Sequence, residues 1–456
     1  MGRLKAVILA AGEGTRMKSA ISKVIHPLLG KPMINYAADA YKNGGCDDIV
    51  IVAGDNIDAL RKAVPWAHFA HQKERRGTGH AVICAVEFIE DDDMVFIAYG
   101  DGPLIRPETV EDIISCHKKS GAAATIVSCV FENPFGYGRI VRKNNAFDRI
   151  VEHKDANDED RLIKEINTGM GCYNGKLLKK ALSQLKCDNV QNEYYLPDVP
   201  LILKNDGEAV NIYVGNNPLD FYGINDRVQL AEAANIIKMR KNTELMLSGV
   251  SIWDPANTYI GPDVSIGRGS CIFPGTIIEG NTVIGEECEI GPNTTIKNTK
   301  IGNSCIIKNS VINCAEIHNN VEIGPFAYLR PKAVIMDGAK IGDFVEVKNA
   351  VVGKNSKANH LAYIGDATLG ENVNFGCGAI TVNYNGKDKF DTVIKDNAFI
   401  GSNSNLIAPV TVESGGYIGA GSTVTKNVPE NCLTVARARQ ENKEGRAPKW
   451  NNSEPI

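Results

Sequence analysis

A glycine-rich turn followed by two cations is the first group of residues in this sequence that could perform chemistry. Gly12 and Gly14 follow a short apolar run, and Arg16 and Lys23 come after them. Backbone N–H groups of such a turn can bind phosphate oxygens, and nearby cations can stabilise a leaving pyrophosphate. The pattern lacks the GxxxxGK[ST] of a P-loop and the third glycine of a dinucleotide fingerprint. It favours a nucleoside triphosphate site with Arg16 and Lys23 as catalytic cations, over a turn that only packs a helix beside a solvated arginine.

A second group of polar residues lies between Val352 and Ile394, where a repeat in the C-terminal half becomes irregular. It contains His360 and the stretch Asn383-Tyr384-Asn385-Gly386-Lys387-Asp388-Lys389, whose end is too long for the repeat and should loop out of it. An imidazole could remove the proton from an amine that attacks a thioester near neutral pH. A single histidine in a β-protein is more often structural, so the spacing alone leaves the role of His360 open.

The repeat around His360 places one aliphatic residue at every sixth position. It runs in three blocks, at 260–296, 317–347 and 394–424, and glycine often follows the aliphatic residue. Six residues are about 1.7 helical turns, so an α-helix would spread these side chains around its surface. The spacing instead predicts a parallel β-helix, in which each hexad is a short strand plus a turn and the aliphatic residue points to the axis. The glycines suit tight corners.

The first half of the chain alternates between strand and helix patterns. We expect strands at 5–10, 48–53, 94–99 and 125–130, and helices at 79–90 and 107–119. This alternation predicts a Rossmann-like α/β domain with a mostly parallel sheet, whose ligands collect at the carboxyl ends of the strands. The glycine-rich turn and Asp101 should lie at that edge. The predicted boundaries are 1–225 for this domain, 226–247 for a linker helix, 248–439 for the β-helix and 440–456 for a charged tail.

The composition of the 456 residues is that of a soluble globular protein with at least two domains. Hydrophobic residues make up 43% and charged residues 23%, and the net charge of −4 shows no bias towards nucleic acid. No segment approaches the length of a membrane span, and the apolar start is too short for a signal peptide. The twelve cysteines show no CxxC or Cys/His metal spacing, which favours free thiols in a reducing cytoplasm over disulfides or zinc.

The stretch Leu9-Ala-Ala-Gly-Glu-Gly-Thr-Arg-Met17, with Lys23, resembles the signature of sugar-nucleotide pyrophosphorylases. Together with the β-helix repeat, it is similar over nearly the whole chain to the family of bifunctional N-acetylglucosamine-1-phosphate uridyltransferase / glucosamine-1-phosphate acetyltransferases. Further motifs of that family are Gly77-Thr78-Gly79-His80-Ala81, Tyr137-Gly138-Arg139-Ile140, Asn167-Thr168-Gly169 and His360-Leu361 with Tyr363 and Gly365-Asp366-Ala367. The resemblance implies an enzyme that acetylates glucosamine 1-phosphate from acetyl-CoA and then transfers uridylyl from UTP to the product. Pyrophosphate would leave, and the UDP-N-acetylglucosamine would supply peptidoglycan and lipopolysaccharide synthesis.

The resemblance also implies site residues, position by position. For uridylyl transfer it implies nucleotide contacts from Leu9, Ala10, Gly12, Lys23, Gln72, Gly77 and Thr78, sugar contacts from Gly138, Glu152, Asn167 and Asn225, and Mg²⁺ ligands at Asp101 and Asn225. For acetyl transfer it implies His360 as the base, sugar-phosphate contacts from Arg330, Lys348, Tyr363 and Asn374, and an acetyl-CoA groove formed by Cys377, Asn383, Tyr384, Ser402, Ala420 and Arg437. Asp101 at a strand end also suits Mg²⁺, which prefers one or two protein oxygens plus phosphates and water, although it could instead cap a helix.

The resemblance further implies a left-handed coil, contrary to the usual right-handed crossover, and a homotrimer with the acetyl site between chains. The chain departs from the family at three places. Arg75-Arg76 stands where an uncharged or apolar pair is usual, and Pro197 where threonine is usual. Cys377 and Ala379 replace alanine and threonine in the expected acetyl-CoA groove.

Two other hypotheses remain beside the bifunctional one. The chain could be a single-activity sugar-1-phosphate nucleotidyltransferase whose β-helix only oligomerises or regulates, although His360, Asn383-Tyr384 and Arg437 argue against this. It could also be a non-enzymatic scaffold, as repeat proteins often are. The set of Arg16, Lys23 and Asp101 disfavours that hypothesis.

Overall fold

The computed structural model describes residues 2–187 and 192–446, and they form two compact units, divided at Lys238 and Met239. The division falls within helix α8 (Arg227–Leu247), which lies in the segment 226–247 predicted as a linker helix. The boundaries at 225 and 248 stay predictions. The carboxylate of Asp226 caps this helix, because it accepts hydrogen bonds from the N–H groups of Val228 and Gln229, both at 2.9 Å. Residues 440–446 of the predicted tail contain no helix or strand, and residues 447–456 lie outside the described part.

The first unit is built on a nine-stranded sheet with helices between its strands. Its main elements, in chain order, are β1 (Leu4–Leu9), α1 (Met33–Asn43), β4 (Asp48–Ala53), α2 (Ile57–Ala63), β5 (His68–His71), α3 (Thr78–Cys84), β6 (Met94–Tyr99), α4 (Pro107–Ser120), β7 (Ala124–Val130), β8 (Gly138–Lys143), β9 (Ala146–Val151), α5 (Asp158–Arg161), β10 (Glu165–Asn174), α6 (Gly175–Leu182), α7 (Asp198–Asn205) and β11 (Val210–Gly215). The strand order is β11-β7-β10-β6-β1-β4-β5. Only β10 runs antiparallel to its neighbours on this path among the described strands, so the sheet is mostly parallel, as predicted.

The alternation of side chains along β1 decides what covers each face of the sheet. Ala6 and Ile8 pack in one core with α1 and α4, whereas Val7 and Leu9 pack in another with α3, α6 and α7. A strand covered on both faces must be apolar throughout, which explains the sequence of β1. The helix predicted at 79–90 ends at Cys84, because a 3₁₀ turn at Val86–Phe88 directs Ile89 into the second core.

The carboxyl ends of β1 and β6 lie side by side. Leu9 is the register partner of Tyr99, and the N–H of Gly100 donates to the carbonyl of Leu9 at 2.9 Å. Parallel pairing therefore brings the glycine-rich turn after β1 and Asp101 after β6 to one edge of the sheet. Among the described residues, no helix of either unit is long and apolar enough to cross a membrane.

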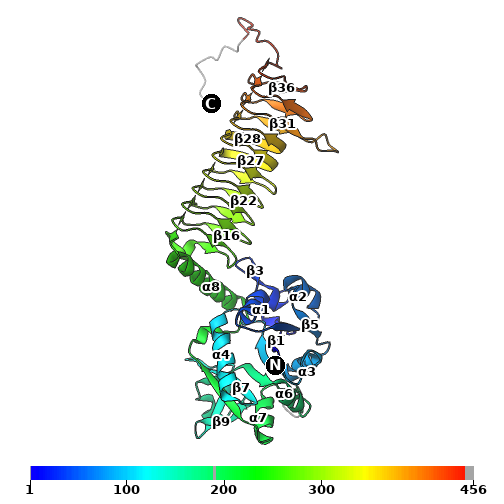
Figure 1. The fold of residues 1–456 in the computed structure, drawn as a ribbon, viewed down its shortest axis with the longest axis vertical. Coiled ribbons are helices and arrows are strands. Elements are labelled where there is room, and N and C mark those ends of the chain that lie inside the picture. Colours follow the sequence, from blue (N-terminus) through cyan, green and yellow to red (C-terminus); the bar gives the residue numbers. More distant parts are fainter. Residues whose placement is uncertain (1, 188–191, 447–456) are drawn as a thin grey trace, which may run out of the picture. The chain divides into compact units, whose positions relative to one another are not determined.

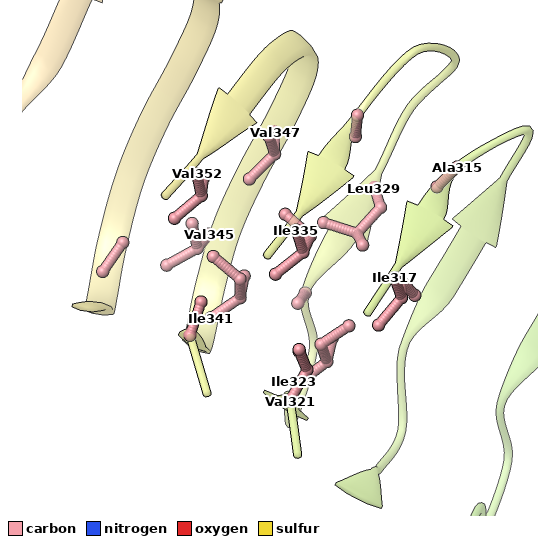
Figure 2. Packing of buried hydrophobic residues seen from close by; sticks show 14 of the residues in the cluster. Ala315, Ile317, Val321, Ile323, Leu329, Ile335, Ile341, Val345, Val347 and Val352 are labelled. Atoms are coloured by element: carbon pink, nitrogen blue, oxygen red, sulfur yellow. The ribbon is translucent and has the colours of Figure 1, made fainter. Parts of the chain in front are cut away.

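The second unit is a parallel β-helix whose described strands run from β12 (Ser251–Ile252) to β37 (Leu433–Thr434). In its regular part each strand pairs with the third one along, so three strands complete one coil, and Figure 1 shows the coils stacked in chain order. The aliphatic ladder faces the axis and is almost fully buried, as Ile260, Ile278 and Ile296 show. Figure 2 shows this packing from Ala315 to Val352.

The slip in the ladder between the first two blocks does not interrupt the core. Ile301, Ile307 and Ile312 continue the buried column, and Ile296 pairs with Ile312 in register. Where a step has fewer than six residues, the turn between the strands is shorter, so the aliphatic side chain still points inward. The glycines serve two purposes at the corners: a Cβ on Gly267 would lie 2.6 Å from the backbone of Gly285, and Gly291 adopts a positive φ of 110°.

The β-helix changes character around His360. Two long strands, β27 (Lys340–Val352) and β28 (Lys357–Leu369), pair along most of their length. The step from Phe375 to its partner Ile400 is longer than the preceding steps, because residues 383–390 leave the coil as a small hairpin. Tyr384 bridges Lys389 there, and the N–H of Phe390 donates to the carbonyl of Asn383 at 2.9 Å. This hairpin is the loop that the sequence predicts.

Candidate active sites

A cavity of about 240 Å³ lies at the carboxyl ends of β1 and β6. All the residues predicted to bind the nucleotide line it, together with Asp101: Leu9, Ala10, Gly12, Lys23, Gln72, Gly77 and Thr78. The buried Gln72 donates through Nε2 to the carbonyl of Gly77 at 3.1 Å. Gly77 has a φ of 101°, and a Cβ there would lie 2.6 Å from the carbonyl oxygen of Tyr194. The structure thus brings this set together around one concave site that needs glycine at its rim.

Two oxygen atoms converge on the ammonium group of Lys23 in this cavity. Lys23 Nζ lies 2.5 Å from Asp101 Oδ2 and 3.1 Å from Asn225 Oδ1. Arg16 also donates to Asn225 Oδ1, at 2.9 Å. Residues from the turn after β1, the end of β6 and the start of α8 therefore form one polar cluster, which the sequence separates by more than 200 positions.

The Asp101 and Asn225 oxygens fit a Mg²⁺ ion that binds together with substrate. One carboxylate and one amide oxygen already share a cation here, since the ammonium of Lys23 contacts both. Among the described residues, no group of three or more His, Cys, Asp and Glu side chains could hold a metal by itself. Mg²⁺ commonly takes only one or two protein oxygens and completes its shell with phosphates and water, so this small donor set suits it.

A second cavity of about 280 Å³ adjoins the first, since Thr78 and Tyr99 line both. Three of the predicted sugar contacts line it: Gly138, Glu152 and Asn167. Burial raises the pKa of Glu152, and the carboxylates of Asp155 and Asp198 raise it further. The fourth predicted sugar residue, Asn225, does not line this cavity and lies in the Lys23 cluster instead.

Four of the predicted acetyl-transfer residues, His360, Cys377, Ser402 and Ala420, follow one column on the outside of the β-helix. The core residues Ile341, Ala358, Phe375, Ile400 and Ile418 are successive register partners on neighbouring coils. The residues two positions after them are Asp343, His360, Cys377, Ser402 and Ala420. Because parallel strands pair in register, these side chains come from the same corner of consecutive coils. The register therefore aligns the proposed base with three of the proposed acetyl-CoA residues.

His360 has a carboxylate partner in this column. Asp343 is its register partner on β27, and Asp343 Oδ1 lies 2.6 Å from His360 Nδ1. This contact lowers the pKa of Asp343, chiefly through the hydrogen bond from the imidazole. With Asp343 ionised, the carboxylate accepts a hydrogen bond from the Nδ1–H of His360, so Nε2 is left as the unprotonated nitrogen.

Three cations gather around Tyr363 and Asp366, which follow His360 on β28. Lys348 Nζ lies 3.6 Å from Asp366 Oδ2, and Arg330 pairs with Glu346 at 2.8 Å. The third cation is Lys389 of the hairpin, whose pKa is lowered because the ammonium of Lys348 lies beside it. Such a cluster suits a phosphate group.

The buried carboxylate of Asp366 connects this cation cluster to the hairpin. It accepts hydrogen bonds from Asn349 Nδ2 at 2.6 Å and from Asn383 Nδ2 at 2.5 Å. Burial alone would raise the pKa of Asp366, but these two hydrogen bonds and the charge of Lys348 outweigh it, so the pKa is lowered. Asn383 in turn donates to the hydroxyl of Tyr363 at 3.5 Å.

The other predicted acetyl-site residues are placed less tightly. Asn374 pairs with Lys357 on a different column from His360, and Tyr384 lies exposed on the hairpin. Arg437 is exposed and lies against Gly421, 3.5 Å from the position of a Cβ there. Ala379, expected in the acetyl-CoA groove, is fully buried in the core of the β-helix, so that expectation is wrong: two residues beyond Cys377, the chain has turned inward. All twelve cysteines lie in the described part and are free.

Sequence reasoning missed three residues of the acetyl site: Asp343, Lys389 as a site residue, and Asp366 as a connecting carboxylate. The sequence did contain a sign of the Asp343 contact. Ile341 and Ala358 occupy equivalent positions of the ladder, Asp343 lies two residues after Ile341, and His360 lies two residues after Ala358. The contacts of Lys389, and the contact of Asp366 with Asn383, depend on how the hairpin folds back, which the repeat does not encode.

Comparison with known families matches each unit separately. Residues 6–169 match the MobA-like NTP transferase domain. Residues 263–298, 314–349 and 391–426 match the bacterial transferase hexapeptide (six repeats). Fold and sites together define a class of bifunctional transferases, in which a nucleotidyltransferase domain is joined to a hexapeptide-repeat transferase domain.

Relatives that match nearly the whole chain narrow this class to one family. The chain is 51% identical over 442 residues to Bifunctional protein GlmU of Geobacillus sp. (strain WCH70), covering 96% of each. It is 48% identical over 450 residues to Bifunctional protein GlmU of Halalkalibacterium halodurans, covering 98% of this chain and 99% of the relative. It is 48% identical over 452 residues to Bifunctional protein GlmU of Clostridioides difficile, covering 99% of this chain and 98% of the relative. The chain belongs to the GlmU family, which confirms the family expected from its motifs and the left-handed hexapeptide β-helix expected with it.

Proposed function

We propose that this chain makes UDP-N-acetylglucosamine in two steps at two separate sites. The β-helix acetylates glucosamine 1-phosphate from acetyl-CoA, and the N-terminal domain joins the product to the uridylyl group of UTP. The observation that carries this proposal is the presence of two separate clusters of polar side chains in one chain. One set is Lys23 with Asp101 and Asn225, and the other is His360 with Asp343.

Uridylyl transfer needs alignment and charge neutralisation rather than a protein nucleophile. A phosphate oxygen of the sugar 1-phosphate attacks the α-phosphorus of UTP, and the bond to the bridging oxygen of the leaving pyrophosphate breaks. The first cavity holds the nucleotide and the adjoining cavity holds the sugar. Arg16 and Lys23 neutralise the charge that develops on the leaving group. Mg²⁺, held by Asp101 and Asn225, would supply further neutralisation of the phosphates when bound.

Acetyl transfer needs a base for the amine of glucosamine 1-phosphate. The amine nitrogen attacks the thioester carbonyl, His360 Nε2 takes the proton released from nitrogen, and the CoA thiolate leaves and is protonated. Asp343 holds the imidazole by its Nδ1–H. Arg330, Lys348 and Lys389 bind the sugar phosphate, and Asn374 and Tyr363 contact the sugar. Acetyl-CoA lies along the column from Cys377 to Ala420.

The proposal includes a homotrimer in the cytoplasm, with the acetyl site completed by a neighbouring copy. Exposed apolar side chains on consecutive coils support association between copies of this chain. Phe344 directly follows Asp343 and Leu361 directly follows His360, and Phe326 lies on the preceding coil. Phe326 and Phe344 stack with ring centroids 5.5 Å apart, and both are more than half exposed, as is Leu361. Contiguous exposed apolar surface of this kind is typical of subunit contacts. Sedimentation equilibrium of the purified chain tests this, and a monomer that transfers acetyl groups would contradict it.

Two point variants test the separation of the activities. His360→Ala should lower acetyl transfer by at least about 10²-fold, the usual contribution of a general base, and leave uridylyl transfer unchanged. Asp101→Ala should do the reverse. Release of CoA thiol measures acetyl transfer and release of pyrophosphate measures uridylyl transfer, both on the same preparations. A wild-type chain that releases pyrophosphate from UTP but no thiol from acetyl-CoA would favour a single-activity nucleotidyltransferase with a structural β-helix.

A further inference from the structure

Arg75 is an arginine in the wall of the nucleotide cavity. It belongs to the segment 72–77, which connects β5 to α3. Its guanidinium contacts three groups across the cavity mouth. Nε donates to the carbonyl of Ala11 at 3.1 Å, one terminal nitrogen pairs with Asp55 Oδ2 at 2.9 Å, and the other pairs with Glu13. Two of these groups belong to the glycine-rich turn.

The turn that Arg75 contacts presents three consecutive backbone donors. The N–H groups of Gly12, Glu13 and Gly14 have no acceptor within the described part of the chain. The carbonyls just before them are both held: Asn56 Nδ2 donates to Ala10 at 3.0 Å, and Arg75 donates to Ala11. A run of free N–H groups whose neighbouring carbonyls are fixed is a preorganised binding site for phosphate oxygens.

The charge of Glu13 conflicts with this use of the turn. Its carboxylate lies in the middle of the segment that should receive a triphosphate, and like charges at close range weaken binding. Arg75 is paired with this carboxylate and cancels its charge. The glutamate and Asp55 are largely exposed, at 57% and 86%, and exposed ion pairs contribute little to folding stability. The contact should therefore matter for nucleotide binding more than for the fold.

We propose that Arg75 is a positioning residue of the nucleotide site, which neutralises Glu13 and fixes the glycine-rich turn so that its N–H groups receive the phosphates of UTP. This inference rests on the proposed uridylyl-transfer function and assigns a further residue to that site. Arg76 offers a matched comparison. It carries the same charge one position further on, but its guanidinium lies over the ring of Tyr194, 5.4 Å from the centroid, and no contact to the turn is found among the described residues.

The test is calorimetric titration of the full-length protein with UTP in the presence of Mg²⁺, with uridine as a ligand that lacks phosphates. Arg75→Gln should weaken UTP binding about three- to tenfold and leave uridine binding unchanged. The double variant Arg75→Gln with Glu13→Gln should recover part of this loss, because the unpaired carboxylate is gone while the contact to the Ala11 carbonyl is still missing. Arg76→Gln should stay within about twofold. All variants should melt within about 2 °C of the wild type, because exposed pairs contribute little to stability.

Three outcomes would overturn the inference: wild-type UTP affinity in Arg75→Gln, an equal loss for uridine, or no recovery in the double variant. The proposed function is tested separately by pyrophosphate release from UTP and N-acetylglucosamine 1-phosphate. A wild-type chain that binds UTP but releases no pyrophosphate would refute the proposed function, while the binding series would still decide the role of Arg75.

Discussion

Asp343 Oδ1 lies 2.6 Å from His360 Nδ1, and the two residues are register partners on neighbouring strands of the β-helix. The carboxylate fixes one tautomer and one orientation of the imidazole. Cys377 occupies the position equivalent to His360 on the following coil.

Replacing Asp343 by asparagine should lower acetyl transfer without preventing folding. The amide keeps the shape of the side chain but loses the charge that holds the protonated imidazole, so kcat should fall about 10- to 100-fold while KM for both substrates changes little. CoA thiol release measures the effect. Uridylyl transfer by the same preparation is the internal control, and an equal loss of both activities would indicate a folding defect instead.

Removing the carboxylate of Asp366 should destabilise the β-helix in a pH-dependent way. Asp366→Ala leaves Asn349, Asn383 and Lys348 without their buried acceptor, so the free energy of unfolding should fall by about 1–3 kcal/mol at pH 7. Because the folded-state pKa of Asp366 is lowered, its contribution is complete above the ordinary aspartate pKa of about 3.9 and is lost as pH falls through the lower folded-state value.

Urea unfolding of the wild type and of Asp366→Ala at several pH values between 7 and 3 measures this difference. Asp388→Asn, in the exposed part of the hairpin, is the matched control and should have no effect. A stability difference that stays constant down to pH 3 would show that the buried charge is not the source.

Chelation should separate the two activities. EDTA removes Mg²⁺, which we propose that Asp101 and Asn225 hold for uridylyl transfer, but the groups proposed for acetyl transfer include no metal ligand. We expect pyrophosphate release to stop and CoA thiol release to continue. Asp101→Asn should raise the Mg²⁺ concentration for half-maximal uridylyl transfer about tenfold or more, because the ion loses a charged ligand. Acetyl transfer that also stopped in EDTA would contradict the assignment.

Alkylation of Cys377 should block acetyl transfer. This thiol is exposed and follows His360 in the column proposed for acetyl-CoA, so a bulky maleimide would occupy the groove. Cys377→Ala should remain active and should resist the reagent. Cys314 is also exposed but lies outside that column, and Cys314→Ala should be inactivated at the wild-type rate. Equal sensitivity of Cys377→Ala and the wild type would refute the placement of the groove.

The sequence by itself determined the architecture of both domains. A six-residue period cannot be satisfied by a helix or a flat strand, so Ile260 to Ile296 specify a coil with one buried aliphatic residue per hexad. The apolar strand before Gly12, alternating with helices, likewise specifies a mostly parallel sheet with its site at the carboxyl edge. These patterns are local, and burial of the apolar side chains leaves few other solutions.

Only the tertiary structure decided how the side chains meet. The register of β27 on β28 sets Asp343 beside His360, and the fold of the hairpin brings Asn383 to Asp366. The same register turns Ala379 into the core, where the sequence suggested a groove. The pairing of Arg75 with Glu13 could not be predicted from the local sequence either, because the order of strands in the sheet brings their two segments together. Contacts between distant residues depend on register and loop conformation, and neither is encoded in the local period of the sequence.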